Sequence, residues 1–509
     1  MSPQVLFIFV LAYFFILLLL AWLTSRNSNN ESFYVGNRNS NWMLVAFGMI
    51  GTSLSGVTFI SVPGTVGVPA GDVYKGFLYF QVVIGYIFGY LVIAFVLLPL
   101  YYRLNLTSIY HFLEHRFGRI AYKTGAVFFI LSRTVGATAR LFLVINVMQL
   151  FILDDMGVPF VVTTMIILVM ILLYTYRGGV KTIVYTDTLQ TIGMLTGLVV
   201  CVIYILHTMD IPFGDAWDTV RSFGYTRIWD THVQGSTFFL KQVLGGMFIA
   251  IAMTGLDQEM MQKNISIKTV QGAQKNMMTF TTILVIVNFL FLLLGGLLYM
   301  FIQQQGGAYT DGGLMYAGKN IMGDALFPTV ALHIFPPVIS IIFIIALISA
   351  LFPSADGALT ALTSSFCIDL LGLQRRKELD EKGQKRIRMT VHFTFAFVFL
   401  LCILIFKWID DNSIIGVILD LAGYTYGPLL GLFAFGVLTK RVLPNHWTIT
   451  AICLGMPLLC YLLKYHGGFL LGDYQIGLEL LLLNGILTFI GLWIISHKQK
   501  TVNNALDGR

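Results

Sequence analysis

Charged residues are scarce in this chain. Asp, Glu, Lys and Arg together make up 11% of its 509 residues, whereas hydrophobic residues make up 57%. The mean hydropathy is +0.80. A soluble globular domain carries about a quarter charged residues. The composition therefore excludes a soluble protein and predicts a membrane protein with many spans.

Several chemical signatures are missing as well. The five cysteines all fall in apolar segments without metal-ligand spacing, so neither a disulfide framework nor a metal centre is predicted. The glycine-rich phosphate loop of the Walker type is absent, which argues against a nucleotide-driven pump. Neither a Ser-His-Asp nor a paired-carboxylate pattern stands out, so we do not expect an enzyme.

Thirteen apolar segments are long enough to cross a bilayer, which takes about 20 helical residues. They lie at 5–24, 42–65, 74–101, 120–152, 157–176, 181–208, 236–262, 274–303, 335–370, 386–407, 413–438, 446–464 and 475–496. The longer loops, 209–235 and 304–334, hold too little apolar sequence for a separate core. Residues 1–509 are therefore predicted to form a single membrane domain.

The distribution of Lys and Arg predicts the orientation, because cytoplasmic loops hold an excess of positive charge. With the N-terminus outside and the C-terminus in the cytoplasm, the inner loops hold 23 of the 32 basic residues and the outer loops hold 6. The basic run 374–388 is then a topology signal and not a nucleic-acid patch. We expect a multi-pass protein of the plasma (inner) membrane, with the lipid bilayer as a partner and no nucleic acid.

The stretch 51–64, inside the second span, is interrupted by glycine, proline and hydroxyl residues. These residues are Gly51, Thr52, Ser53, Ser55, Gly56, Thr58, Ser61, Pro63 and Gly64. Non-helical backbone at membrane depth survives only where protein or a water-filled cavity satisfies it. We predict a broken helix that lines a binding site for ions or polar solutes. The alternative is a kinked helix packed through small residues.

A second interruption, at 245–258, lies in the seventh span. Spans two to six and seven to eleven can then be inverted halves, since five spans per half reverse the topology of the second half. The predicted organisation is an extra helix at 1–24, a first repeat at 42–208, a second repeat at 236–438 and two extra helices at 446–496.

Motifs along nearly the whole chain resemble the sodium:solute symporters, a family that includes sodium/glucose, sodium/proline, sodium/sialic acid and sodium/monocarboxylate transporters. They are Phe33-Tyr-Val-Gly-Asn-Arg38, Leu98-Pro-Leu-Tyr-Tyr-Arg103, the runs 107–118, 177–180 and 186–190, Asp257-Gln-Glu-Met-Met-Gln262, and the run 422–431. Each is weak alone, but their order and spacing are specific. The resemblance implies the leucine-transporter-like inverted-repeat fold and sodium-driven solute uptake.

The resemblance also implies a principal sodium site. Its carbonyl positions correspond to Gly51 and Leu54 on the broken helix, and its ninth-span positions to Ala350, Pro353 and Ser354. The sequence departs from the family here, because Pro353 replaces a hydroxyl residue. A hard cation in a dry site needs several oxygen ligands, so the missing hydroxyl must be compensated elsewhere.

Asp356 is the expected compensation for Pro353. A carboxylate at membrane depth is costly and should face the helix bundle with a partner. Asp187 resembles the family's acid near a second sodium site, so Asp187 and Asp356 are predicted to hold a second cation or a proton. The alternative is that Asp356 only pairs with an arginine.

Arg133 and Arg140 lie in the middle of the fourth span, seven residues apart and on one helical face. Guanidinium binds carboxylate through two parallel hydrogen bonds, so an inward arginine suits an anionic solute. Arg133 resembles by position an arginine that contacts the substrate carboxylate in the sialic acid branch of the family. The alternative is that both arginines are held structurally by Asp356, Asp187 or broken-helix carbonyls.

The predicted function is sodium-coupled import of a small organic solute, with Na+ as the coupling ion. The solute is expected to be an anion, a monocarboxylate or an acidic sugar, bound by Thr52, Ser53, Ser55, Thr58, Arg133 and Arg140. A neutral sugar, an amino acid or a vitamin is the alternative solute. A membrane sensor or channel on the same fold is the alternative class, and it is disfavoured because no signalling domain follows the last span in this sequence.

Overall fold

The structure is a computed structural model that describes residues 3–25, 33–34, 38–70, 73–310, 313–376, 378, 380–409, 414–468, 472 and 474–498. The side chains of 3, 25, 176–179, 181 and 414–417 fall outside the described part as well. Some predicted features therefore lie outside it: the middle of the 33–38 motif, the side chains of most of the 177–180 motif, and the charges of Arg26, Arg177, Lys181, Lys377, Lys500 and Arg509.

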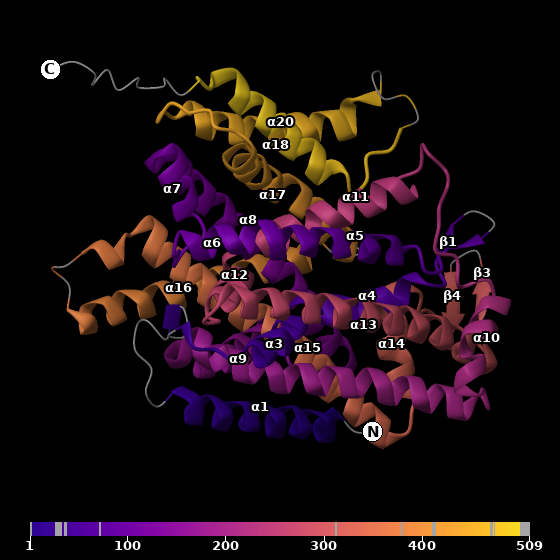
Figure 1. Cartoon of the computed structure of the whole chain (residues 1–509). Coiled ribbons are helices and arrows are strands. Elements are labelled where there is room, and N and C mark those ends of the chain that lie inside the picture. The colour runs from indigo at the N-terminus through magenta and orange to yellow at the C-terminus, as the bar shows by residue number, and fades with distance from the viewer. Residues whose placement is uncertain are drawn as a thin grey trace, which may run out of the picture.

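Long helices lie side by side across the view of Figure 1 and form nearly all of the described chain. The long ones are α1 (Pro3–Ser25), α5 (Tyr79–Val92), α8 (Arg119–Met148), α9 (Phe160–Thr208), α13 (Val270–Gln304), α15 (Pro337–Ser365), α16 (Glu381–Ile409), α17 (Ile414–Leu438), α18 (Thr448–His466) and α20 (Leu480–Ile495). The two bent pairs are α3 (Trp42–Ser53) with α4 (Gly56–Thr65), and α11 (Phe239–Ala250) with α12 (Gln258–Ile265).

Short elements extend or connect these helices. The helical ones are η2 (Ile93–Leu97), α6 (Leu98–Arg103), α7 (His111–Phe117), η3 (Gln149–Leu153), η4 (Phe213–Asp215), α10 (Ala216–Ser222), η5 (Ile251–Gly255), η6 (Gly323–Ala325), α14 (Leu326–Thr329), η7 (Val330–Ile334), η8 (Phe366–Leu370) and η9 (Leu373–Arg375). Two small antiparallel sheets lie at one end of the molecule: β1 (Pro69–Ala70) with β2 (Val73–Tyr74), and β3 (Ala308–Thr310), β4 (Gly313–Tyr316) and β5 (Lys319–Asn320) in that order.

The number of spans can be compared with the prediction. Within the described residues, nine helices are long and apolar enough to cross a membrane, and the two bent pairs raise the number to eleven. Two shorter apolar helices, Phe160–Thr175 and Leu480–Ile495, lie in the two remaining predicted ranges. A multi-span helical membrane protein is confirmed, and the count of thirteen stays a prediction.

Helix α9 forms one helical run but cannot be straight. At 1.5 Å per residue, a straight helix would place Ile167 and Gly197 about 45 Å apart. Both residues nevertheless lie against neighbouring positions of α15. Ile167 lines a small cavity together with Ile348, and a Cβ on Gly197 would overlap the side chain of Ala346. The chain therefore reverses direction between them, as two separate spans at 157–176 and 181–208 require.

Loops alternate between the two ends of the molecule as the topology predicts. Pairs of predicted inner loops meet through Glu114 with Arg375 and through Val442 with His497. At the predicted outer end, Tyr309 and Gln234 of two loops meet Tyr74 and Gln475, the first residues of two predicted spans. These contacts agree with the predicted alternation, and the charge distribution alone indicates which end faces the cytoplasm.

The first bent pair is broken and not merely kinked. Helix α3 ends at Ser53, α4 begins at Gly56, and the two axes differ by 56°. Leu54 has φ −86° and ψ 75°, and Ser55 has φ −75° and ψ 177°, so both residues leave the helical region. The predicted broken helix is confirmed at residues 54–55.

The second bent pair breaks later than the glycines at 245 and 246. The run from α11 through η5 reaches Gly255, α12 begins at Gln258, and the bend is 64°. The Asp257 carboxylate caps α12 by accepting from the backbone N–H groups of Glu259 and Met260. Helix α12 then continues to Ile265, three residues beyond the predicted end of this span.

Glycines let α5 approach α11 at backbone distance. A Cβ on Gly85 would overlap the carbonyl oxygen of Val243, and a Cβ on Gly246 would overlap the carbonyl oxygen of Val82. Small residues at such contacts let membrane helices pack closely. Helix α11, the first half of the second broken helix, is therefore tightly joined to a helix of the predicted first repeat.

Candidate functional site

The break in the first bent pair frees backbone oxygens at a buried position. No backbone N–H in the described chain donates to the carbonyl of Gly51 or Leu54, whereas the next carbonyl, that of Ser55, accepts from Phe59. Freed carbonyls of this kind suit a cation. A Cβ on Gly51 would lie 3.5 Å from Cγ of Pro353, so this part of the break faces α15.

Helix α15 continues through Pro353, whose lack of an N–H has a local consequence. The carbonyl of Ser349, one turn earlier, loses its usual helical donor. Ser354 is buried, and its hydroxyl donates 3.1 Å to the carbonyl of Leu351. An oxygen lone pair of Ser354 is still available to a ligand. The residues present fit a sodium site made of carbonyl and hydroxyl oxygens.

A cavity opens beside the same break. The space between its lining atoms is about 800 Å³, with open solvent at its mouth included. Its polar lining gathers all six residues predicted to bind the solute: Thr52, Ser53, Ser55, Thr58, Arg133 and Arg140. Tyr79, Tyr86 and Tyr90 of α5, Thr254 of η5 and Asn288 of α13 add further polar groups. The polar composition of this lining suits a small polar solute.

Arg133 lines this cavity but already has partners in the protein. One of its guanidinium nitrogens donates to the Glu259 carboxylate, and another lies 3.8 Å from Oδ2 of Asp257. That oxygen of Asp257 also accepts from the Tyr426 hydroxyl at 2.9 Å. All these side chains are buried. Arg133 therefore ties α8 to the second broken helix, through carboxylates that the sequence prediction did not consider.

Arg140 lies two turns further along α8 and differs from Arg133 in its ion-pair partners. Its guanidinium lines the cavity but makes no hydrogen bond or ion pair within the described part of the chain. A buried or half-buried guanidinium normally needs anionic partners. Of the two arginines expected to suit an anionic solute, Arg140 is therefore the one without a carboxylate partner in the described chain.

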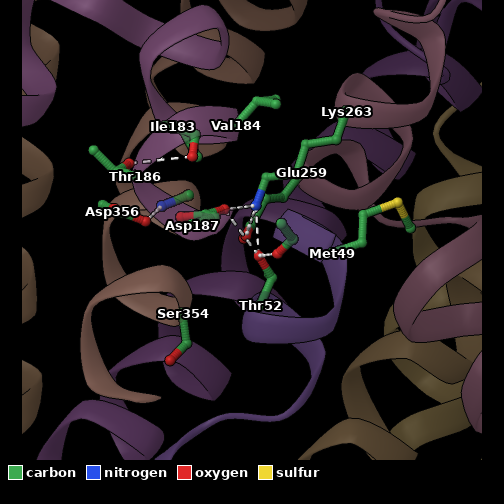
Figure 2. Close-up of polar contacts among 12 residues, drawn as sticks. Met49, Thr52, Ile183, Val184, Thr186, Asp187, Glu259, Lys263, Ser354 and Asp356 are labelled. Carbon is green, nitrogen blue, oxygen red and sulfur yellow. Dashed lines mark hydrogen bonds and ion pairs between the residues drawn. The ribbon is translucent and has the colours of Figure 1, made fainter. Parts of the chain in front are cut away.

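Figure 2 shows Lys263 of α12 reaching into a cluster of oxygens. Its Nζ lies 2.7 Å from Oδ2 of Asp187, 2.5 Å from Oγ1 of Thr52 and 3.5 Å from Oε1 of Glu259. Glu259 in turn pairs with Arg133 through its other oxygen. One chain of buried ion pairs thus runs from Asp187 on α9 to Arg133 on α8.

Asp356 lies to the left of Asp187 in Figure 2, on the side away from Lys263. Its carboxylate accepts 2.8 Å from the Tyr174 hydroxyl and also accepts from the backbone N–H of Gly357. It is fully buried. In the described chain no lysine or arginine lies within 4 Å of it, so the alternative in which Asp356 pairs with an arginine receives no support.

Comparison with known proteins decides the family. The sequence profile of the sodium:solute symporter family matches residues 33–445. The chain belongs to the sodium:solute symporter family. It is a multi-pass membrane transporter driven by Na+, and not an enzyme.

Relatives of this symporter include the sodium/sialic acid symporter SiaT of Proteus mirabilis, 23% identical over 419 residues that cover 81% of this chain and 80% of SiaT. Mouse sodium-coupled monocarboxylate transporter 1 is 27% identical over 425 residues, covering 80% of this chain and 64% of that protein. A solved substrate-bound, outward-open Na+-coupled sialic acid symporter matches with a TM-score of 0.80 at 18% identity, covering 97% and 99% of the two chains. The likeness confirms the all-α, five-plus-five inverted-repeat fold.

Sequence reasoning about the symporter missed Lys263 and Glu259. The predicted span 236–262 ends just before Lys263 and so places it among the inner-loop charges, whereas it is 2% exposed and lies inside the second broken helix. The signal was present in the sequence. Asp257, Glu259 and Lys263 directly follow an interrupted apolar segment, and Glu259 and Lys263 stand four residues apart, on one helical face. A basic residue near a predicted span end is ambiguous until the helix end is known.

Proposed function

We propose that this symporter imports a small organic anion together with sodium, and that Arg140 binds the carboxylate of the solute. The observation that carries the proposal is the guanidinium of Arg140, which lines a polar cavity and has no ion-pair partner among the described residues. A bound carboxylate supplies the missing partner, whereas a neutral analogue leaves the charge unpaired. Relatives that transport sialic acid and monocarboxylates fit this class of solute.

The coupling ion is assigned to the oxygens beside that cavity. We assign the ion to the freed carbonyls of Gly51 and Leu54 and to Ala350 and Ser354 of α15, and we propose that the Ser349 carbonyl takes the place of the hydroxyl lost at Pro353. Sodium here fixes the backbone on which Thr52, Ser53, Ser55 and Thr58 contact the solute. Ion and solute then stabilise one conformation, so each strengthens binding of the other.

The proposed setting is the plasma (inner) membrane, with the N-terminus outside and the C-terminus in the cytoplasm. The excess of Lys and Arg in the predicted inner loops supports this orientation. A green fluorescent protein fused after residue 509 should fluoresce in cells, since it folds in the cytoplasm. A dark fusion that is expressed at a normal level would reverse the assignment.

The solute assignment is tested by sodium-driven uptake into proteoliposomes, with labelled monocarboxylates, acidic sugars, neutral sugars and amino acids. Arg140→Lys keeps the charge but loses the planar fork, and should weaken binding of the transported anion by about 1 to 3 kcal/mol. Arg441→Lys, at a guanidinium that lies over Trp493 away from the cavity, is the control. Transport of a neutral solute that Arg140→Lys leaves unchanged would contradict the proposal.

The sodium assignment is tested at Ser354. Ser354→Ala removes one ligand from a small set and should raise the sodium concentration needed for half-maximal uptake. Ser340→Ala removes another buried α15 hydroxyl, which donates to the Ala331 carbonyl, and should not change this concentration. Equal sodium dependence in wild type and Ser354→Ala would remove Ser354 from the site.

A further inference from the structure

The ammonium of Lys263 is held by three oxygens from three different helices. Thr52 belongs to α3, Asp187 to α9 and Glu259 to α12, and their oxygens lie 2.5, 2.7 and 3.5 Å from Nζ. An ammonium has three N–H donors, so this set uses its full donor capacity. The side chain is 2% exposed, which excludes bulk water as a regular partner.

The same oxygens are those that a hard cation would choose. A hydroxyl and two carboxylates make up the set, and hard cations prefer oxygen ligands of these kinds. Asp187 is also the residue at which the family resemblance implied a second sodium site. The position predicted for a second ion therefore already holds a positive charge that belongs to the chain.

A sodium ion cannot share these oxygens with the ammonium. Two like charges about 3 Å apart in a dry interior repel strongly. The ammonium is covalently attached, so it cannot be released on the other side of the membrane. It holds Thr52 of the first broken helix against α9 at every sodium concentration, a task that would otherwise fall to a transported ion.

We infer that Lys263 is a tethered replacement for a second coupling cation, so that one sodium ion accompanies each solute. The inference rests on the proposed function in assuming that the remaining ion binds at Gly51, Leu54, Ala350 and Ser354. It also makes cotransport of a monovalent anion electrically neutral. Removing the ammonium should reopen Asp187 to sodium.

Three proteins test the inference: wild type, Lys263→Ala, and Lys263→Ala combined with Asp187→Asn. The number of 22Na+ ions bound per purified protein should be about one, two and one in that order. The Hill coefficient for sodium activation of uptake should follow the same order. Lys241→Ala removes another buried lysine, whose Nζ lies 3.7 Å from Oε1 of Glu479 at the outer end of α11, and should bind one ion as wild type does.

Each result decides the matter. Two ions bound by wild type would overturn the inference, even if Lys263→Ala does not fold. One ion bound by a folded Lys263→Ala, shown by its thermal unfolding transition, would make Lys263 a purely structural ion-pair partner. Sodium binding is measured without solute. A wild type that binds one ion but transports no anion would therefore contradict the proposed solute and leave the Lys263 assignment standing.

Discussion

Both broken helices interrupt their backbone hydrogen bonds inside the membrane, but the two breaks differ in what satisfies the polar groups. Residues 42–65 contain no Asp, Glu, Lys or Arg, and Ser55, at the N-cap of α4, makes no side-chain capping bond. The second pair carries Asp257, Glu259 and Lys263, and Asp257 caps its own helix. The second break therefore satisfies itself with side chains, whereas the first leaves polar groups free for ions and solute. The same bend can thus serve either as a support or as a binding site.

The largest expected effect is a loss of folding stability when the ion pairs of the second broken helix are removed. Arg133→Met leaves the Glu259 and Asp257 carboxylates without a guanidinium in a buried region, which should cost about 3 to 5 kcal/mol of folding stability. Thermal unfolding in detergent measures this loss. Adding Glu259→Gln to Arg133→Met removes the buried charge that has lost its guanidinium and keeps only its 3.5 Å contact with Lys263, so it should recover part of the stability. An unchanged unfolding temperature for Arg133→Met would show that this pair does not support the second break.

Alanine substitutions at Gly51 and Gly357 should have a smaller effect on stability, and only the first should change the sodium dependence of uptake. A Cβ at Gly357 would overlap Oε1 of Glu259, and a Cβ at Gly51 would overlap Oγ1 of Thr191. Each alanine should cost about 1 to 3 kcal/mol through overpacking. We expect Gly51→Ala also to weaken sodium activation of uptake, because it moves a proposed ion ligand.

Gly357→Ala should lower stability and leave the sodium dependence close to that of wild type. Gly136→Ala is the matched control, since a Cβ there meets nothing within 4 Å inside α8. It should be neutral or slightly stabilising through helix propensity. Equal sodium dependence in Gly51→Ala and Gly357→Ala would erase the functional difference between the breaks.

The smallest effect is expected at an exposed ion pair outside both breaks. Arg375 donates to Glu114, and this hydrogen bond lowers the pKa of the Glu114 carboxyl. A lowered carboxyl pKa adds stability above the pKa of the unfolded chain, and this stability is lost as the pH falls through the folded pKa. Arg375→Ala should cost less than about 1 kcal/mol near neutral pH. Wild type and variant should converge in unfolding temperature as the pH falls, and a constant difference would contradict this account.

Much of the fold could be predicted because bilayer length and apolar composition constrain spans strongly. The first break could be predicted because glycine and hydroxyl residues are conspicuous in an apolar run; these are Gly51, Thr52, Ser53 and Ser55. The second break, at Leu256–Asp257, was less visible because its polar residues sit near the predicted membrane boundary. Sequence spacing alone does not tell whether a charge such as Lys263 snorkels to the interface or turns inward.

The partners of the arginines could not be predicted for a related reason. Arg133 and Arg140 share a helical face, so periodicity treats them alike. Their difference comes from α12, which brings Glu259 beside Arg133 from 126 positions away in the chain. Which guanidinium meets a carboxylate of the described chain is therefore a tertiary property, visible only when α8 and the second broken helix are placed together.

The glycine contacts between α5 and α11 have a mechanical consequence. Helices that touch backbone to backbone cannot slide or part without losing contact over their whole length, so α5 and α11 should move as one rigid panel. Tyr79, Tyr86 and Tyr90 on α5 and Ile249 on α11 belong to that panel and form one wall of the cavity. A solute must then enter or leave between other helices, because α5 and α11 stay in contact when this wall moves.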